Sequence, residues 1–447
     1  MYLIKKIILK NKKNFFLIAY SGGIDSTVLL YKMIKIKKNY PKIQIRAIHI
    51  NHNIQSSSNQ WEEHCIEVCQ HSHVPLILEK INTKFKKNVE EKLRIERYKI
   101  IFNHLMPDEI LLTGHHLNDQ CETLILSLKR GSGPTGLSGI YSERFFGQKK
   151  IVRPFLKIKK KELEQWANHK KIKWIEDFSN LNINYDRNFI RHKIIPILEK
   201  RWPFFLKNCS RTAMICSEET KLKNILLKEK IKNFINCDTS LNFSFFKNMK
   251  KEICTALIRY WISLKNIKMP SYKLIECIYN EIIFSKTDAN PKIIIKKNEI
   301  RRYKNSLYFI KTQKNINNRL IFWHNQNKKL FLPNNLGYLI QNNKGFVLPA
   351  PKKNELINIR FQFEGKILII GREKRRKIKK IWQECNIPPW LRTQIPLLFY
   401  NNHFISAIGV FVINREMYSR ETEIQKKWII SWISDIEINS NNLFLFH

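Results

Sequence analysis

The feature that most constrains this chain is the run Ser-Gly-Gly-Ile-Asp-Ser at residues 21–26. It follows an apolar, strand-like stretch at 15–20 and precedes a helix-like stretch at 27–33. Two adjacent glycines permit a tight turn whose amide groups face one concavity, and the start of the helix adds the positive end of its dipole. The run therefore predicts a phosphate-binding turn. The alternative is a plain strand-to-helix connection in which Ser26 caps the helix.

The side chains of this turn suit a nucleotide and its metal ion. The hydroxyl groups of Ser21 and Ser26 can donate to phosphate oxygens, and Asp25 is placed where a carboxylate can hold Mg²⁺. The run lacks the Gly-Lys-Ser/Thr ending of the Walker loop and the spaced glycines of the dinucleotide turn. It resembles the Ser-Gly-Gly-x-Asp-Ser signature of the ATP pyrophosphatases, which split ATP between the α and β phosphates and adenylate a substrate. The resemblance implies that ATP is bound by Ser21, Gly22, Gly23, Ile24, Asp25 and Ser26.

Residues 15–130 alternate between strand-like and helix-like segments. This order is typical of an α/β fold with a doubly wound parallel sheet, in which ligands lie beyond the carboxyl ends of the strands. The turn at 21–26 lies at such an end, and so does the run at 113–116. The expected strands are 15–20, 43–50, 76–78 and 109–113, and the expected helices are 27–33, 59–69 and 88–105.

The polar run at 114–123 leads into an apolar helix at 124–128. Within it, Asp119 and Glu122 are three residues apart, so in a helix they share one face and can hold a cation, either Mg²⁺ or a substrate ammonium. The alternative is a pair of acids that stabilises the first turn of a helix. Two adjacent histidines without a third ligand at useful spacing argue against zinc.

A glycine-rich loop follows at 131–139. It holds four of the 13 glycines of the whole chain, which is dense for a mere connector. Arg130, Ser132 and the backbone amides of the loop can face an anionic ligand, so the loop favours a local function.

From this point the resemblance becomes specific to the tRNA(Ile)-lysidine synthase family. Members adenylate the C2 oxygen of the wobble cytidine in a CAU anticodon, and the ε-amine of free L-lysine then displaces AMP. In this chain Asn118 stands where many members carry an aspartate, which removes one carboxylate from the second motif. The motifs that carry the resemblance are the runs at 21–26, 114–123, 130–139, 152–156, 174–180 and 185–191.

The resemblance implies roles for particular residues. Asp25, Asp119 and Glu122 are expected to be catalytic, with Asp25 on Mg²⁺ and the other two orienting the lysine ammonium and accepting its proton. Phosphate contacts are expected from Arg130, Arg187 and Arg191, although a solvated basic helix face explains the last two equally well. The implied partners are ATP, Mg²⁺, L-lysine and tRNA(Ile) with a CAU anticodon.

The charge of the chain points to a polyanionic partner. Lys and Arg number 80 against 37 Asp and Glu, a formal net charge of +43. Part of this excess is compositional, because Lys, Ile and Asn crowd every segment. Residues 371–380 carry seven positive charges before an apolar stretch, which favours a phosphate-tracking surface on a folded module. Arg375, Arg376 and Lys379 represent this surface, and the segment resembles the C-terminal tRNA-binding domain of longer family members.

Cysteine usage and hydropathy indicate the compartment. Nine cysteines occur without a C-x-x-C pair, which fits a reducing cytoplasm better than a disulfide framework or an iron–sulfur site. The first apolar run, 3–9, is broken by two lysines and is too short to span a membrane. We expect a cytoplasmic protein with no membrane partner. The oligomeric state stays open, a homodimer included.

The length of 447 residues suits about three domains. We expect a catalytic domain at 1–205, a mainly helical tRNA-binding domain at 206–315, a linker or small sheet at 316–350, and a small basic α+β domain at 351–435. Residues 192–235 are expected to form amphipathic helix, and helices at 253–264 and 271–284 precede strands at 292–295 and 307–310.

Three other functions remain open. A sulfur-inserting tRNA enzyme shares the Ser-Gly-Gly turn, but such relatives usually need paired cysteines. A glutamine-dependent amidotransferase needs a nucleophilic cysteine at the N-terminus or in a separate domain, and position 2 is Tyr. A non-catalytic RNA-binding protein of this fold explains the charge, but not the joint presence of Asp25, Ser26, Asp119 and Glu122.

Overall fold

The structure is a computed structural model, and its residues fall into two units, Met1–Leu226 and Leu227–His447, each considered by itself. The described residues are 13–51, 58–81, 89–176, 178–267, 269–286, 289–352, 354–370, 373–413 and 427–434. The apolar run at 3–9, Asp177 and residues 371–372 lie outside them. Within the described ranges, no helix has the length and apolar character needed to cross a bilayer.

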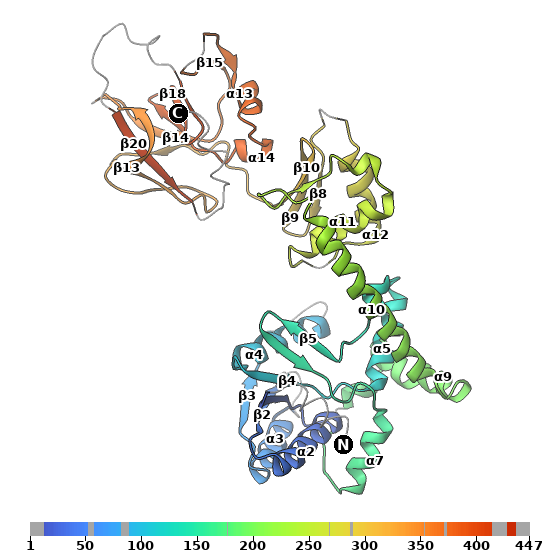
Figure 1. The fold of residues 1–447 in the computed structure, drawn as a ribbon. Coiled ribbons are helices and arrows are strands. Elements are labelled where there is room, and N and C mark those ends of the chain that lie inside the picture. The colour runs from blue at the N-terminus through green and yellow to red at the C-terminus, as the bar shows by residue number, and fades with distance from the viewer. Residues whose placement is uncertain are drawn as a thin grey trace. The chain divides into compact units, whose positions relative to one another are not determined.

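The first unit is built on a six-stranded sheet in the order β3-β2-β1-β4-β6-β5 (Figure 1). All neighbouring strands are parallel except the edge pair of β5 and β6, so the predicted doubly wound sheet is confirmed, with one antiparallel strand added. The strands are β1 (Phe15–Ala19), β2 (Gln44–Asn51), β3 (Leu76–Lys80), β4 (Glu109–Leu112), β5 (Glu143–Phe146) and β6 (Lys149–Val152).

Helices cover both faces of this sheet because its central strands are apolar on both sides. In β1, Phe16 and Ile18 pack into the core shared with α2 (Ile24–Asn39), α3 (Ser58–His71) and α7 (Lys160–His169). Leu17 points to the other face, where it packs with residues of α4 (Val89–His104). The period of two along a strand explains this division.

The carboxyl ends of three neighbouring strands define one edge of the sheet. β1 lies between β2 and β4, and β6 follows β4, with Ile18 opposite Leu112 and Leu112 opposite Val152. The segments that follow Ala19, Leu112 and Val152 therefore lie next to one another. This edge carries the candidate site.

Helices beyond the sheet complete the first unit. α5 (Leu117–Lys129) starts at the carboxyl edge, and a short helix, α6 (Pro134–Leu137), lies inside the glycine-rich loop. Residues 192–235, which we expect to form amphipathic helix, are helical over most of this range up to Ile231, with a break at Trp202–Pro203, where proline cannot continue the helical hydrogen bonding. The observed elements are α8 (Asp186–Phe189), a π-helical segment (Ile190–Ile194), α9 (Ile195–Arg201) and α10 (Phe205–Ile231).

The second unit begins with helices packed on a four-stranded sheet. The buried Trp261 and Ile258 of α11 (Lys251–Ser263) share a core with Ile300 and Leu307. The predicted helices and strands of this region are confirmed. The remaining elements are α12 (Tyr272–Cys277), a π-helical segment (Ile278–Ile283), β7 (Leu241–Asn242), β8 (Lys292–Ile295), β9 (Asn298–Tyr303) and β10 (Ser306–Lys311).

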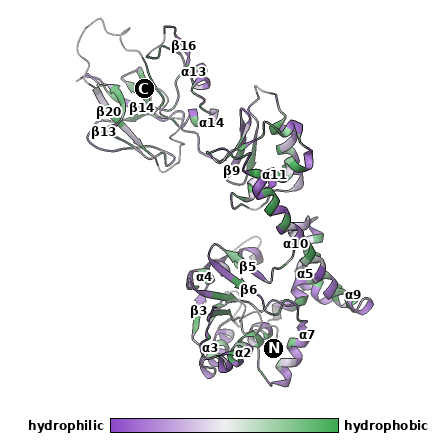
Figure 2. Ribbon diagram, viewed as in Figure 1, coloured by the Kyte–Doolittle hydropathy of each residue, from purple (hydrophilic) through white to green (hydrophobic). Residues whose placement is uncertain are grey.

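The described residues of the remainder of the second unit are rich in strands, with two short helices among them. One sheet has the order β11-β14-β17-β18-β19 and another the order β12-β13-β20. Figure 2 shows apolar residues on β14 and β20. The elements are β11 (Ile321–Phe322), β12 (Leu330–Phe331), β13 (Tyr338–Pro349), β14 (Ile357–Arg360), β15 (Lys366–Ile367), β16 (Arg376–Lys377), α13 (Ile378–Glu384), α14 (Pro389–Arg392), β17 (Leu397–Tyr400), β18 (His403–Ala407), β19 (Phe411–Val412) and β20 (Lys427–Ile433).

Candidate active site

The turn after β1 is braced from within and leaves its amides for a ligand. The Ser26 hydroxyl accepts a hydrogen bond from the Ser21 amide at 3.1 Å and donates to the Gly23 carbonyl at 2.9 Å. Gly23 precedes α2, and no side chain caps that helix. Uncapped amides at a helix start bind anions, so the turn has the form of a phosphate site. Ser26 acts inside the turn and not as the cap.

Two glycines are required by the geometry of this turn. Gly22 has a φ of +80°, and a Cβ there would lie 3.1 Å from the Cys65 sulfur. Gly114, at the end of β4, packs against the turn so closely that a Cβ would lie 2.9 Å from the carbonyl carbon of Asp25. The strand end at 113–116 therefore supports the phosphate turn directly.

Asp25 faces this second strand end. Its side chain is one-third exposed, and its Oδ2 lies 3.6 Å from Nε2 of His116. Its Oδ1 is buried and has no hydrogen-bond partner within the described residues. A buried carboxylate oxygen without a donor is suited to a cation, which supports the expectation of a metal ion here. Within those same residues no group of three or more His, Cys, Asp or Glu side chains is arranged to hold a metal ion, so such an ion would need oxygen ligands from substrate or water.

His116 links Asp25 to the acidic pair. It precedes α5 and exchanges two hydrogen bonds with Asp119: its Nδ1 accepts from the Asp119 amide at 3.3 Å, and the Asp119 Oδ2 accepts from the His116 amide at 2.9 Å. Because Nδ1 accepts, the neutral ring carries its proton on Nε2, toward Asp25. Burial opposes protonation, but Asp119 and Asp25 raise the pKa of His116 above its ordinary value. His116 is thus the N-cap of α5, and Asp119 completes a capping box with it.

Two arginines neutralise the acidic pair. Glu122 is fully buried, and its two oxygens accept from Nε of Arg191 and Nε of Arg187, each at 2.7 Å. Arg187 also donates from Nη2 to Oδ1 of Asp119 at 3.1 Å. Burial opposes ionisation of Asp119, but His116, Arg187 and the hydrogen bond from the His116 amide lower its pKa. The four groups form a closed network of two carboxylates and two guanidinium groups.

The network joins segments that are distant in sequence. Arg187 and Arg191 lie four apart across α8 and the π-helical segment, so both reach the same side. An ion pair between Lys129 and Asp186, at 2.6 Å, fastens the end of α5 to the start of α8. The structure thus brings together Asp25, Asp119, Glu122, Arg187, Arg191 and the turn at 21–26.

Arg130 and Asn118 lie outside the network. Arg130 is exposed after the last residue of α5, about 12 Å along the helix axis from Glu122. Asn118 accepts a hydrogen bond from the Lys160 amide at 3.1 Å and so caps α7. An aspartate would accept the same bond, so the departure from the usual motif leaves the network intact.

The glycine-rich loop is tied to α5 by one side chain. Oε1 of Gln120 accepts from the Ile140 amide at 2.6 Å. Gly139 has a φ of +60°, and a Cβ there would lie 2.7 Å from the same oxygen. The end of the loop therefore packs beside the first turns of α5. At Gly131 and Gly133, by contrast, a Cβ would have no atom within 4 Å.

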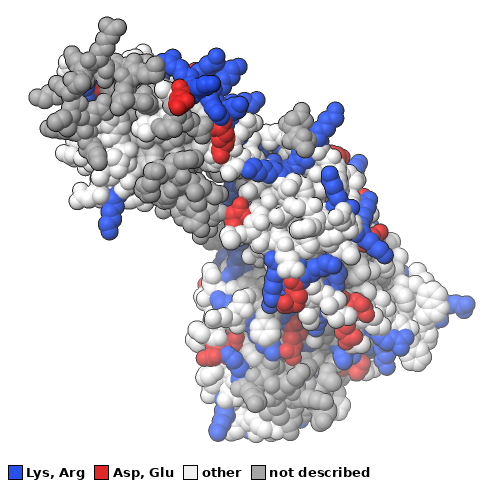
Figure 3. All heavy atoms as spheres, turned by 45° about the horizontal axis from the view of Figure 1, so that its top comes forward, with Lys and Arg blue, Asp and Glu red and all other residues white. Residues whose placement is uncertain are grey.

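The basic run of the second unit forms an exposed cluster. Arg375, Arg376 and Lys379 are exposed around β16 and the start of α13, and Figure 3 shows Lys and Arg gathered at the top of the C-terminal unit. Arg376 is paired with Glu384 at the far end of the helix. The apolar side of α13 packs inward through Ile381 and Trp382, so the cluster lies on a folded element.

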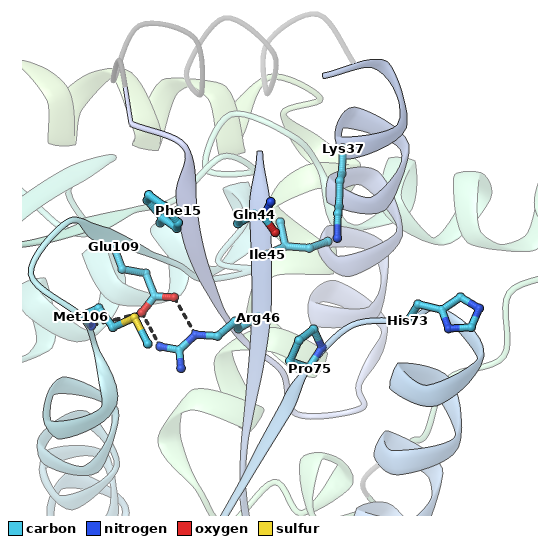
Figure 4. A pocket seen from close by; sticks show the side chains of 9 residues that line it. All are labelled: Phe15, Lys37, Gln44, Ile45, Arg46, His73, Pro75, Met106 and Glu109. Atoms are coloured by element: carbon cyan, nitrogen blue, oxygen red, sulfur yellow. Dashed lines mark hydrogen bonds and ion pairs between the residues drawn. The ribbon is translucent and has the colours of Figure 1, made fainter. Parts of the chain in front are cut away.

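A cavity of about 450 Å³ lies at the opposite, amino end of the strands (Figure 4). Its principal charges are already matched, because Arg46 donates to Glu109 from Nε at 3.0 Å and from Nη2 at 2.7 Å. Phe15, Ile45, Pro75 and Met106 supply apolar walls. The cavity does not include any residue of the turn or of the acidic pair.

Comparison with known proteins follows the same division of the chain. A family model described as a PP-loop domain matches residues 2–198. One described as a TilS substrate binding domain matches residues 241–308, and one described as a TilS substrate C-terminal domain matches residues 357–432.

Full-length relatives share most of the sequence. The chain is 71% identical over 445 residues to the tRNA(Ile)-lysidine synthase of Buchnera aphidicola subsp. Schizaphis graminum, covering 100% of both chains. It is 37% identical to the protein of that name from Shigella flexneri, covering 92% of this chain and 95% of that one. Among solved structures, the U34-tRNA thiolase NcsA from Methanococcus maripaludis is 20% identical with a TM-score of 0.38, over 45% of this chain and 71% of that chain.

Sequence reasoning missed the connecting residues of the site. His116 appeared only as half of a histidine pair, and Gly114 only as part of a strand end. The signal for both is their place directly after a buried strand at the ligand-binding edge. Arg153 lies in the run at 152–156 that carries the resemblance but was given no role there, and Arg97 had no signal beyond its residue type.

Proposed function

This chain belongs to the tRNA(Ile)-lysidine synthase family, and we propose that it joins free L-lysine to C2 of the wobble cytidine in the CAU anticodon of tRNA(Ile). ATP activates the cytidine by adenylation of its C2 oxygen, with release of pyrophosphate. The ε-amine of lysine then attacks C2 and AMP leaves, so the tRNA reads AUA as isoleucine. The product carries a new carbon–nitrogen bond, and the reaction consumes one ATP.

One observation carries this proposal: the phosphate turn and the acidic pair share His116. Its two nitrogens lie 3.6 Å from Asp25 and 3.5 Å from Asp119. A two-step ligation needs the nucleotide and the amine on opposite sides of one acceptor atom. Groups suited to a phosphate and groups suited to an ammonium, held on adjacent strand ends, supply such an arrangement.

The nucleotide side is formed by the turn at 21–26. We propose that the backbone amides of Gly22 to Ile24 and the Ser21 hydroxyl bind the phosphates of ATP, while Ser26 holds the shape of the turn. Asp25 would hold Mg²⁺, which shields the phosphate charge when bound. The orphaned Oδ1 of Asp25 supports this assignment.

The amine side is formed by the closed network. Free lysine carries ammonium groups and one carboxylate, and a surface that alternates carboxylates with guanidinium groups is complementary to such a zwitterion. We propose that Asp119 and Glu122 orient an ammonium group of lysine and accept its proton. Arg187 and Arg191 are proposed to bind the carboxylate of the same lysine. Because positive neighbours lower the pKa of Asp119, its first contribution is to hold the charge of the ammonium in place.

The tRNA side is formed by the residues that follow the catalytic domain. We propose that residues 206–315 and 351–435 are tRNA-binding domains, joined by residues 316–350, and that Arg375, Arg376 and Lys379 contact phosphates there. The family models that match residues 241–308 and 357–432 support this division. Arg130 is proposed to contact the anticodon arm from the end of α5. We place the reaction in the cytoplasm, where tRNA, ATP and free lysine meet.

Exchange of labelled pyrophosphate into ATP tests the order of steps. If adenylation comes first and is reversible, exchange requires tRNA(Ile) but not lysine, and lysine then drives AMP release. Asp25→Ala should abolish exchange, whereas Glu164→Gln, a change at a partly exposed position on α7, should not. Exchange by Asp25→Ala at the wild-type rate would remove Asp25 from the chemistry.

A further inference from the structure

Two arginines beside the network have no carboxylate partner. Arg153 follows β6 and is only 6% exposed, yet its Nε has no acceptor within the described residues. Its Nη1 donates to the Tyr141 carbonyl at 2.7 Å, and its guanidinium hydrogen-bonds the Tyr98 side chain. Arg97, on α4, lies 5.9 Å from the centre of the Tyr98 ring. No described carboxylate forms an ion pair with either arginine, in contrast to Arg187 and Arg191.

Their position is set by the sheet. β6 runs parallel to β4, and the Thr113 amide donates to the Val152 carbonyl at 3.2 Å, so Arg153 and Thr113 follow adjacent strand ends. The Thr113 hydroxyl is 2.8 Å from Nδ1 of His115. Arg153 therefore lies one strand further along the same edge as the phosphate turn and the acidic pair.

The pKa of His115 also indicates that several arginines lie near this edge of the sheet. Burial, together with the charges of Arg153, Arg187 and Arg97, lowers the pKa of His115 to about 3, against the opposing effect of Asp119. Desolvation and the neighbouring Arg94 also lower the pKa values of Arg97 and Arg153 themselves. Positive charge accumulates here, and His115 stays neutral beside it.

Burying guanidinium groups without an anion is costly, and proteins retain such groups where a ligand supplies the missing charge. The two pairs of arginines at this edge differ in that respect. Asp119 and Glu122 satisfy Arg187 and Arg191, whereas Arg97 and Arg153 keep donors without an acidic acceptor. An anion that enters next to His115 would meet those donors.

We propose that Arg97 and Arg153 form a second phosphate-binding site, separate from the turn at 21–26, which holds a phosphate group of a bound substrate. The planar fork of arginine matches two oxygens of a phosphate, and the half-buried Arg97 is the accessible member of the pair. The group comes either from the RNA backbone next to the target nucleotide or from ATP. The inference deepens the proposed function, because it assigns the contact that fixes a substrate against the reacting edge.

Binding measurements separate the two sources. Arg97→Gln, Arg153→Gln and Arg153→Lys are compared with Arg201→Gln, an exposed arginine at the end of α9. tRNA(Ile) affinity is measured by filter binding over a range of salt, and ATP affinity by equilibrium dialysis without tRNA. An RNA phosphate predicts about a tenfold loss in tRNA affinity and a salt slope smaller by about 1, with ATP unaffected. An ATP phosphate predicts a similar loss for ATP alone.

If both affinities in Arg97→Gln and Arg153→Lys equal those of Arg201→Gln, the second phosphate site is refuted. Arg153→Gln is used only if its thermal melt matches wild type, because Arg153 is nearly buried. These binding results do not depend on turnover. If wild-type enzyme formed no lysidine while the arginine variants lost phosphate affinity, the proposed function would fail and the site would stand.

Discussion

Nε2 of His116 lies 3.6 Å from Oδ2 of Asp25, while the other side of the same ring is hydrogen-bonded to Asp119. One buried imidazole therefore spans the distance between the phosphate turn and the acidic pair. Hydrogen bonds with the backbone at the start of α5 fix the orientation of the ring. A substitution of either carboxylate should therefore alter the position of the other. This relationship makes the histidine a positioning residue for both halves of the site.

His116→Gln should slow lysidine formation about 100-fold with little effect on the KM for ATP, because the carboxylates lose their common support while the phosphate turn remains. The pH profile gives a second readout. Wild-type activity should change in a step as the pH passes through the raised pKa of His116, and the variant should lack this step. His169→Gln, exposed on α7, should keep the step. A variant with normal turnover would show that the ring has no part in positioning.

Glu122→Gln should destabilise the first unit by about 3–5 kcal/mol, because it leaves Arg187 and Arg191 with a neutral partner in a buried place. Urea denaturation followed by circular dichroism measures the change. Glu164→Gln, at an exposed ion pair on α7, should stay within about 0.5 kcal/mol of wild type. Equal midpoints for the two variants would contradict a closed network.

Asp119→Asn should cost about 2 kcal/mol near neutral pH and much less in acid. The folded-state pKa of Asp119 lies below its ordinary value of about 3.9, so the ionised form stabilises the fold. That contribution is complete above the unfolded pKa and is lost as pH falls through the folded pKa. The difference between wild type and variant, measured by urea denaturation from pH 7 to pH 3, should therefore begin to shrink below about pH 4. A difference that grows in acid would reverse the assigned sign.

Gly22→Ala should weaken ATP binding at least about tenfold, because its φ of +80° disfavours a side chain and the new Cβ would press on the Cys65 sulfur. Gly147→Ala is the matched control. Gly147 has a φ of +59° with open space around it, so the same substitution costs about 1–2 kcal/mol of strain without touching the turn. Equilibrium dialysis with ATP compares them, and equal affinities would mean that the turn tolerates distortion.

Charge reversal at Arg375 and Lys379 should weaken tRNA binding and reduce its salt dependence by a slope of about 2. Glu384→Gln tests the same cluster in the other direction. It removes the partner of Arg376, so binding should strengthen and its salt dependence should steepen. Filter binding at several salt concentrations measures both. If neither variant moves the affinity, the cluster is a solvated face and its charge is compositional.

Local pattern was enough to predict the sheet and its ligand-binding edge. Apolar runs such as 15–20 and 109–113 are short, uninterrupted and followed by polar residues, which is the pattern of a strand buried on both faces. The antiparallel strand β5 was not predicted, because Glu143–Phe146 is an exposed edge without the apolar pattern of its neighbours. The break between α9 and α10 at Pro203 was not predicted either, although proline interrupts helical hydrogen bonding.

For the candidate site as well, some residues could be predicted from local sequence and others could not. Asp25, Asp119 and Glu122 could be singled out because each lies within a few residues of a strand end or shares a helix turn. The partners of the acidic pair could not, because Arg187 lies 65 residues beyond Glu122 and only the folded chain brings them together. Spacing within a motif reports local geometry, whereas the charge balance of a buried site depends on packing between distant elements.

Mass spectrometry of the wobble nucleoside tests the central claim most directly. tRNA(Ile) with a CAU anticodon is incubated with the purified chain, ATP, Mg²⁺ and isotopically labelled L-lysine, then digested to nucleosides. The proposed function predicts that cytidine at the wobble position gains labelled lysine with loss of water, and that the gain requires ATP. An unmodified wobble cytidine after complete reaction with an active, folded preparation would contradict it.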